Sequence, residues 1–163
     1  MPYATALPTD WTTYTYDGLG RTKRAEAADG IATTYEYLGN TVTVTDAAGK
    51  WKYYATDALG NLILVAEPDP GLGTVVTNYT YDVLNHLVTV SMPRGSVTQP
   101  RTFNYGTPPG ALLLSAYNPE SGTVSYSYNG DQTLHSKTDA NGQTLPYNYD
   151  ADKGLVTVVN NGV

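Results

Sequence analysis

The sequence contains no cysteine, which excludes disulfide bonds, thiolate zinc sites and a cysteine nucleophile. Only nine of 163 residues are lysine or arginine and the formal net charge is −6, so the basic surface of a nucleic-acid-binding protein is missing. The longest apolar runs, residues 62–66 and 111–114, are far shorter than the ~20 residues of a membrane span. No signal peptide is visible at the N-terminus.

The composition instead favours strands and turns. The chain has 15 tyrosines against one phenylalanine and is rich in threonine, and β-branched and aromatic residues are enriched in strands. Sixteen glycines and ten prolines supply many turns. No segment shows a helical period with caps. The chain is therefore predicted to be all-β.

A short motif with two aromatic residues recurs along the chain. Residues 14–17 read Tyr-Thr-Tyr-Asp, the motif returns at 79–82 and 147–150, and degenerate copies lie between them. The copies begin at positions 14, 35, 54, 79, 103, 126 and 147, a period of about 22 residues. We expect residues 1–13 to form an N-terminal strand or arm and residues 14–163 a single domain of about seven repeats. The motif residues, to which we assign structural roles, are Tyr14, Tyr16, Asp17, Gly20, Arg21, Tyr35, Tyr37, Tyr54, Asp57, Gly60, Tyr79, Tyr81, Asp82, Phe103, Tyr105, Tyr126, Tyr128, Tyr147, Tyr149 and Asp150.

Each repeat is predicted to contain two strands and two turns. The first turn follows the Asp of the motif, and a second Asp or Asn near a Gly follows about twelve residues later, as at 46–49 and 139–142. Such units give stacked antiparallel β-hairpins in a wide, twisted, open sheet or partial shell. Residues i and i+2 of a strand share a face, so tyrosines of adjacent repeats are expected to form ladders on one face.

Three further expectations concern local packing. The Asp at the end of each motif strand should accept hydrogen bonds from turn amides. The apolar residue two positions later, as at Leu19, Leu59 and Leu84, should pack under the turn. The prolines are expected in turns and at edges, and residues 92–110, where proline, arginine and glycine accumulate, are expected to form a longer loop.

The motif Tyr14-Thr15-Tyr16-Asp17-Gly18-Leu19-Gly20-Arg21, repeated in phase, resembles the YD repeat of Rhs proteins, of the B and C components of insecticidal toxin complexes and of teneurins. The resemblance covers residues 14–160. It implies hairpins that spiral into a wide sheet, which in full-length relatives forms a hollow shell around a toxic C-terminal polypeptide or presents an adhesion surface. The self-cleaving aspartate region of the family is not recognisable after Asp150. The resemblance therefore implies a repeat segment of a larger protein or a short stand-alone repeat protein.

No catalytic residue, metal site or cofactor is predicted. His86 and His135 occupy a turn and a strand position, and no Gly-x-Ser-x-Gly sequence is present. The recurring aspartates suit turn capping, and a hydrolase with a carboxylate pair is the least favoured hypothesis. Residues 150–154 have a faint likeness to a calcium loop but lack its third acidic position and distal Glu.

Two non-enzymatic functions follow from these features. The first is a β-scaffold that pairs through its edge strands, around residues 12–17 and 155–159, either with other copies in a filament or with further repeats of a longer chain. The alternative is a carbohydrate-binding or adhesion module in which exposed aromatics, Trp11 and Trp51 above all, stack on sugar rings. We expect a secreted or cell-surface location, with no nucleic-acid partner.

Overall fold

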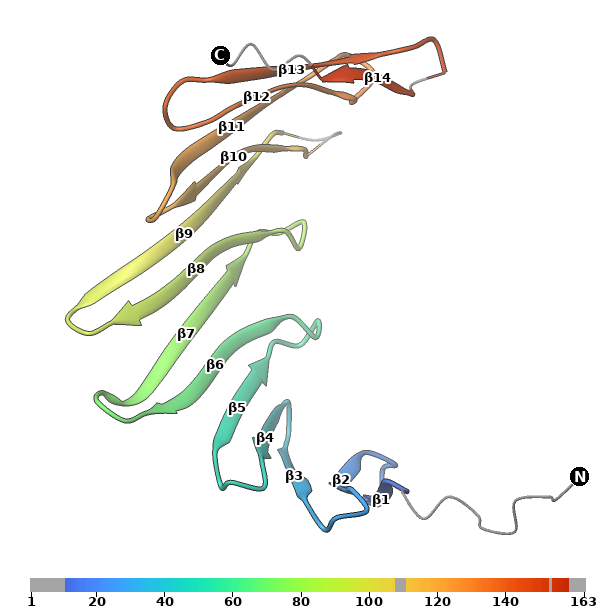
Figure 1. Ribbon diagram of the computed structural model, residues 1–163, viewed down its shortest axis with the longest axis vertical. Coiled ribbons are helices and arrows are strands. Elements are labelled where there is room, and N and C mark those ends of the chain that lie inside the picture. The colour runs from blue at the N-terminus through green and yellow to red at the C-terminus, as the bar shows by residue number, and fades with distance from the viewer. Residues whose placement is uncertain (1–10, 108–110, 153, 159–163) are drawn as a thin grey trace, which may run out of the picture. The chain divides into compact units, whose positions relative to one another are not determined.

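The computed structural model describes residues 11–107, 111–152 and 154–158, and fourteen β-strands contain most of them. The described residues form no helix, and so none that could cross a membrane. The strands follow one another in the sheet in chain order (Figure 1). The all-β class and the open antiparallel sheet are therefore confirmed. Residues 1–10 of the expected N-terminal arm lie outside the described residues.

The chain divides into two compact units, the first of which is Met1–Asn78. It contains six whole strands and most of a seventh, and each strand pairs antiparallel with the next. The strands are β1 (Thr13–Tyr16), β2 (Thr22–Glu26), β3 (Ala32–Leu38), β4 (Thr41–Thr45), β5 (Trp51–Thr56), β6 (Leu62–Asp69) and β7 (Gly73–Tyr81). In β4 threonines and valines alternate strictly, which places Val42 and Val44 on one face and the threonines on the other.

The second unit is Tyr79–Val163, and its strands also pair antiparallel with their neighbours in sequence. They are β8 (Leu87–Arg94), β9 (Val97–Tyr105), β10 (Leu113–Asn118), β11 (Gly122–Tyr128), β12 (Leu134–Thr138), β13 (Thr144–Tyr149) and β14 (Leu155–Val158). Half-buried and exposed residues alternate along the whole length of strand β11, which is the pattern of a strand with one partly covered face and one solvent-exposed face.

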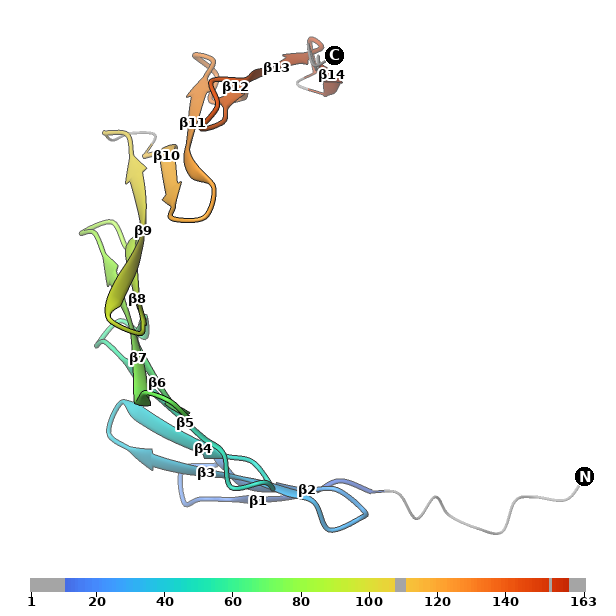
Figure 2. The same cartoon turned by 60° about the vertical axis from the view of Figure 1, so that its left-hand side comes forward.

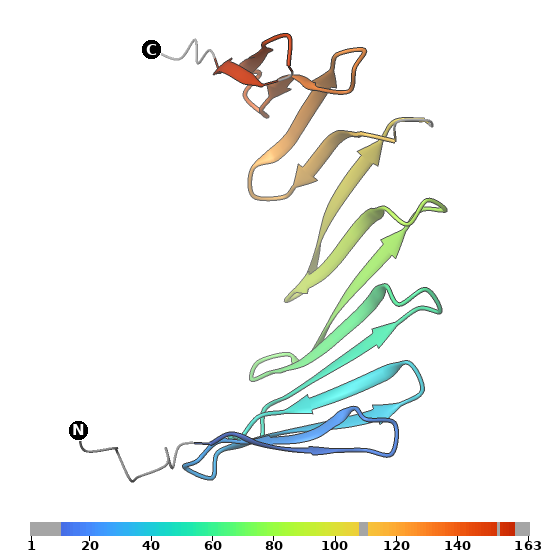
Figure 3. The ribbon, with the colours of Figure 1, turned by 90° about the vertical axis from the view of Figure 1, so that its right-hand side faces the viewer.

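Each unit is a single layer of strands. Figure 2 shows no second layer against either face of the described strands, and Figure 3 shows the strands joined by turns at their two ends. Only Ala66 and Ala116 are buried among the described hydrophobic residues, each 8% exposed. The larger apolar side chains of the described strands are half-buried, as Tyr54 is, or exposed, as Leu38 is, since Figure 2 shows no opposite layer to cover them.

A β-bulge precedes the motif turn in several repeats. The register shifts by one residue between Thr15 and Tyr16, between Ala55 and Thr56, and between Ser127 and Tyr128. The same shift occurs between Asn148 and Tyr149. A bulge adds one residue to the second strand and bends it locally. The sequence analysis did not predict this feature, since the extra residue has no fixed identity.

The expectation of a long loop at residues 92–110 is wrong. Residues 87–94 and 97–105 form β8 and β9, joined by a tight turn in which Gly95 has a φ of 61°. Pro100 lies within β9 opposite Ser91, whereas β10 begins to pair with β9 only at Thr102. One side of this part of β9 has no ladder partner, and a residue without an N–H is tolerated there.

The expectation that prolines avoid strands is also wrong at other positions. Pro68, Pro93 and Pro146 lie within β6, β8 and β13. Pro68 lies beyond Ala66, the last residue of β6 that pairs with β5, so its missing N–H breaks no bond to that strand. Pro70 and Pro119 do lie in turns. Pro108 and Pro109 lie outside the described residues.

Candidate functional site

The turn between β1 and β2 is a closed five-residue structure organised by one carboxylate. The Oδ1 atom of Asp17 accepts hydrogen bonds from the backbone N–H groups of Leu19 and Arg21, both at 2.9 Å. The backbone N–H of Asp17 donates to the carbonyl of Arg21 at 2.9 Å, and that of Gly20 donates to the carbonyl of Asp17 at 3.0 Å. Gly20 has a φ of 79°, which a residue without a Cβ adopts freely.

The same turn recurs in both units. In each copy an aspartate Oδ1 accepts hydrogen bonds from the N–H groups two and four residues later. Counted from the aspartate as the first residue, the fourth residue has a positive φ in the five of six copies where the structure describes it. The aspartates are Asp17, Asp46, Asp57, Asp82, Asp139 and Asp150. The left-handed residues are Gly20, Gly49, Gly60, Asn85 and Gly142. The sequence expectation that these aspartates accept turn amides therefore describes the geometry well.

The fifth residue of the motif turn adds a side-chain donor to the second carboxylate oxygen. Arg21 Nε lies 2.7 Å from Asp17 Oδ2, and His86 Nδ1 lies 2.9 Å from Asp82 Oδ2. Asn61 Nδ2 donates to the equivalent oxygen of Asp57 at 2.9 Å. Three different side chains thus perform one task, the closing of the turn by a donor.

These contacts hold three carboxylates in their ionised form. The backbone N–H of Arg21 lowers the pKa of Asp17, and the side-chain amide of Asn61 lowers that of Asp57. The backbone N–H of His86 lowers the pKa of Asp82. Both oxygens of each carboxylate accept hydrogen bonds from residues of its own turn. A carboxylate that is ionised and bound in this way has no proton to donate, so none of the three is placed as a general acid. The geometry gives no support to a hydrolase that uses these residues.

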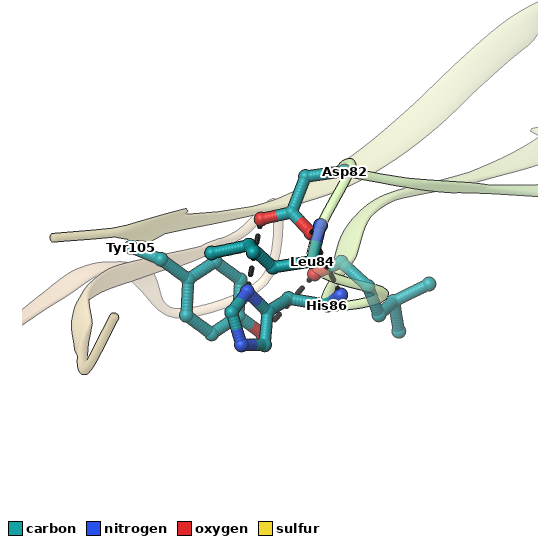
Figure 4. A network of polar contacts seen from close by, with 5 residues as sticks. Asp82, Leu84, His86 and Tyr105 are labelled. Carbon is teal, nitrogen blue, oxygen red and sulfur yellow. Dashed lines mark hydrogen bonds and ion pairs between the residues drawn. The ribbon is translucent and has the colours of Figure 1, made fainter. Parts of the chain in front are cut away.

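The second aromatic residue of a repeat joins that repeat to the one before it. The Tyr105 ring stacks on His86 with ring centres 4.6 Å apart, and its hydroxyl donates to the Leu87 carbonyl at 3.2 Å (Figure 4). Burial, and then the charge of Asp82, raises the pKa of Tyr105. The Tyr128 hydroxyl likewise donates to the Leu113 carbonyl at 2.8 Å. In each case the acceptor is the first residue of the strand immediately before, Leu87 of β8 for Tyr105 on β9 and Leu113 of β10 for Tyr128 on β11.

In the first unit the equivalent link is a cation–π contact. The Arg21 guanidinium lies over the Tyr37 ring, 4.2 Å from its centre. The residue that closes one turn therefore also packs on the second tyrosine of the next repeat, as His86 does on Tyr105. We call this pairing of turn-closing residue or strand carbonyl with the next repeat's second aromatic the tyrosine staple.

The expected tyrosine ladders are mixed rows. Tyr37, Val42, Tyr54 and Val65 stand opposite one another on successive strands, so each tyrosine faces a valine rather than a second tyrosine. All four are half-buried, as is Tyr35 on the same face. We call the face that carries these residues the tyrosine face. Tyrosines of adjacent repeats therefore share one face, and a valine of the intervening strand lies between them.

The opposite face of the second unit is hydroxyl-rich. Ser127 and Ser136 oxygens lie 2.7 Å apart on β11 and β12, and Thr138 and Thr144 oxygens lie 2.9 Å apart on the next pair. Thr123, Ser125 and Ser127 of β11 are exposed, whereas Val124, Tyr126 and Tyr128 on its other face are half-buried. This part of the second unit is therefore amphipathic, with half-buried tyrosines on one face and exposed hydroxyl groups on the other.

The leucines of the motif turns do not pack under them, contrary to expectation. Leu19 and Leu59 are 79% and 80% exposed, and Leu84 is 49% exposed. The N–H of this residue must point at the carboxylate, as in Leu19 to Asp17, and it lies at the tip of the turn. Its side chain therefore projects from the edge of the sheet.

Trp51 contributes to a shallow pocket in the first unit. The pocket has a volume of about 330 Å³, and its lining includes Asp46, Trp51, Tyr54 and Glu67. Glu67 also forms an ion pair with Lys52, whose Nζ lies 2.9 Å from Glu67 Oε2. Trp11 is 61% exposed and lies outside this lining.

The remaining motif residues lie on the first strand of each hairpin, and nothing in the described structure gives them a catalytic role. Tyr14 and Tyr16 on β1 are 54% and 59% exposed. Tyr79 and Tyr81 lie on β7, Phe103 on β9, Tyr126 on β11, and Tyr147 and Tyr149 on β13. His135 is an exposed residue of β12. No cluster of histidine and acidic residues suited to a metal occurs among the described residues.

Solved structures with the same arrangement of strands are parts of toxin complexes. The crystal structure of TcdB2-TccC3-Cdc42 matches with a TM-score of 0.75 at 16% identity, over 91% of this chain and 8% of that one. TcdB2-TccC3 matches with a TM-score of 0.73 at 18% identity, with the same coverage. The Photorhabdus luminescens Tc holotoxin pore matches with a TM-score of 0.72 at 16% identity, over 90% of this chain and 8% of that one.

These likenesses confirm the repeat fold that the sequence motif implied. The chain has the fold of toxin-complex chains and spans about 8% of their length. No protein-family model and no curated protein sequence matches it.

Proposed function

We propose that this chain is a non-enzymatic YD-repeat scaffold, a segment of a toxin-enclosing or cell-surface shell built from many such repeats. The observation that carries the proposal is the match of 91% of the chain to a small part of a toxin-complex chain. The recurring aspartate turn and the tyrosine staple support it, because the turn joins the two strands of one repeat and the staple holds that repeat to the next.

The exposed surface supports a chain that is covered by something else in its working state. Its accessible area is 11421 Å², whereas a compact monomer of 17.5 kDa exposes about 7,900 Å². The excess is comparable to the area that an obligate interface buries. Further repeats or further copies that continue the sheet would cover its end strands, and a second layer would be needed to cover its faces.

The end strands offer the means of continuation. Strand β1 is the first strand of the sheet and pairs only with β2. It contains no charged residue, and an uncharged open edge pairs readily with another strand. We propose that β1 adds a strand either from further repeats of the same chain or from a second copy, the latter giving a filament. A secreted or cell-surface location suits both assemblies.

Sedimentation velocity over a range of concentrations tests this proposal. The full chain should associate, and Thr13→Lys with Thr15→Lys on β1 should suppress association, because charges on an edge strand oppose pairing. The matched control is Thr123→Lys with Ser125→Lys on β11, which is an interior strand with exposed hydroxyl residues of the same kind. Association that persists in the β1 variant, or is lost equally in the control, would contradict edge pairing.

Carbohydrate binding is a second candidate, favoured by the pocket beside Trp51. The ring supplies a stacking surface, and Asp46 and Glu67 supply acceptors for sugar hydroxyls. Titration with a panel of soluble oligosaccharides, followed by tryptophan fluorescence, should give a response that Trp51→Ala removes and Trp11→Ala keeps. A response lost only with Trp11 would place binding outside the pocket, and no response would refute the candidate.

A further inference from the structure

Two Asn-Gly sequences lie in turns of the second unit, at 129–130 and 141–142. A third, at 161–162, lies outside the described residues. In such a pair the glycine backbone nitrogen can attack the asparagine side-chain carbon. A C–N bond forms, ammonia leaves, and water opens the resulting succinimide to aspartate or isoaspartate. The reaction needs only water, so the local structure decides where it occurs.

The two glycines occupy different positions in equivalent turns. Gly142 is the fourth residue of its turn, where its N–H donates to the Asp139 carbonyl at 3.0 Å and its φ is 80°. Gly130 is the second residue of its turn. That turn is closed by the N–H of Asn129 to the Thr133 carbonyl and by the N–H of Gln132 to the Asn129 carbonyl, both at 2.9 Å, so the Gly130 N–H takes part in neither bond.

The side chain of Asn129 is also held over its own turn. Its Nδ2 donates to Thr133 Oγ1 at 2.9 Å. Asn129 stands where the other turns carry the aspartate that reaches back to the amides of its own turn. The bond from Nδ2 therefore holds the Asn129 side chain against its own turn, which contains the backbone nitrogen of Gly130. Gly130 is exposed, and a Cβ added to it would meet no atom within 4 Å.

We propose that Asn129 is a site of spontaneous deamidation in the folded protein and that Asn141 is protected. The nitrogen at Gly130 is available to attack, whereas attack at Gly142 must first break the bond to Asp139. One net hydrogen bond corresponds to a rate factor of about five. Deamidation at Asn129 should therefore be about fivefold faster than at Asn141, or more.

The product changes the charge of this turn. A carboxylate at 129 would stand beside Asp131, whose Oδ1 already accepts the N–H and hydroxyl of Thr133 at 3.1 and 2.7 Å. Asp150 lines the same shallow pocket as Asn129 and Asp131, so three acidic groups would meet there. The isoaspartate product also adds one carbon to the main chain, which lengthens the loop that Asn129 and Thr133 close.

Peptide mapping by mass spectrometry tests the proposal on the intact chain, aged in mildly alkaline buffer. We expect acid at 129 to accumulate several-fold faster than at 141, with isoaspartate detectable by isoaspartyl methyltransferase labelling. In concentrated urea the two rates should become equal, because the hydrogen bond to Asp139 is lost. Gly130→Ala should slow the reaction at 129 without affecting 141.

Three results would overturn the inference. Equal rates in the folded chain would show that the turn bond does not protect Asn141. A ratio unchanged by urea would assign the difference to sequence rather than to structure. Absence of acid at 129 after ageing would show that the held side chain is kept from the nitrogen of Gly130.

Discussion

Gly60→Ala isolates the cost of the left-handed position in the aspartate turn. Gly60 is the fourth residue of the turn between β5 and β6, with a φ of 89°, and its N–H donates to the Asp57 carbonyl at 3.1 Å. A Cβ placed on Gly60 meets no atom within 4 Å. Any loss of stability on substitution therefore comes from the backbone conformation and not from a clash.

The expected magnitude follows from two opposing effects. A residue with a Cβ costs roughly 1–2 kcal/mol in the left-handed region. Replacement of glycine by alanine also restricts the unfolded chain, which returns roughly 0.4–1 kcal/mol. The net expectation is a loss of about 1 kcal/mol in the free energy of unfolding. With an m-value of roughly 2 kcal/mol/M, the urea midpoint should fall by about 0.5 M.

Urea denaturation followed by circular dichroism measures this shift. The matched control is Gly18→Ala in the same unit, since Gly18 is the second residue of a motif turn, has equally open space around it and is not among the residues with positive φ. The control should leave the midpoint unchanged or raise it slightly. Equal destabilisation by both variants would refute the argument, because it would show that the left-handed conformation is not what requires glycine.

The remaining predictions concern the carboxylates and the tyrosine staple. Since the pKa of Asp57 is lowered on folding, its stabilisation is present above the unfolded value of about 3.9 and is lost as the pH falls through the lower folded value. Acid denaturation should therefore be less steep for Asp57→Asn, and an unchanged pH profile would contradict this. Tyr105→Phe removes the donor to the Leu87 carbonyl and should lower the free energy of unfolding by about 1 kcal/mol, whereas Tyr126→Phe should have a smaller effect. Thermal or urea melts of the two variants compare them directly, and equal losses would deny the staple.

The sequence predicts the strands and the aspartate turns because both depend on local chemistry. Alternation of Thr and Val in residues 41–45 requires an extended backbone with two different faces. An Asp three residues before Gly, as at Asp57 and Gly60, specifies both the acceptor and the left-handed residue of the turn. These signals lie within five residues of one another and need no tertiary context.

The features that the sequence did not predict depend on register and on neighbouring strands. The partner of Tyr105 is the Leu87 carbonyl, 18 residues away, and no pattern around either residue identifies the other. Pro100 is tolerated in β9 because the pairing of β9 with β10 begins only at Thr102. The sequence of β9 alone does not reveal where that pairing begins. The Leu59 side chain is exposed because the N–H of Leu59 points toward Asp57 at the tip of the turn. Hydrophobicity alone would predict that this side chain is buried.

Amide hydrogen exchange at low and high protein concentration tests most directly whether the chain is a framework that continues through its end strand. Dilute protein should protect the amides of β4 to β6 and leave outward-facing amides of β1 to exchange quickly. At high concentration the amides of β1 should gain protection. The amide of the second residue of each aspartate turn, such as Gly18, should stay unprotected at both concentrations. Exchange in β1 that is independent of concentration, with no slower population at any concentration, would contradict the account.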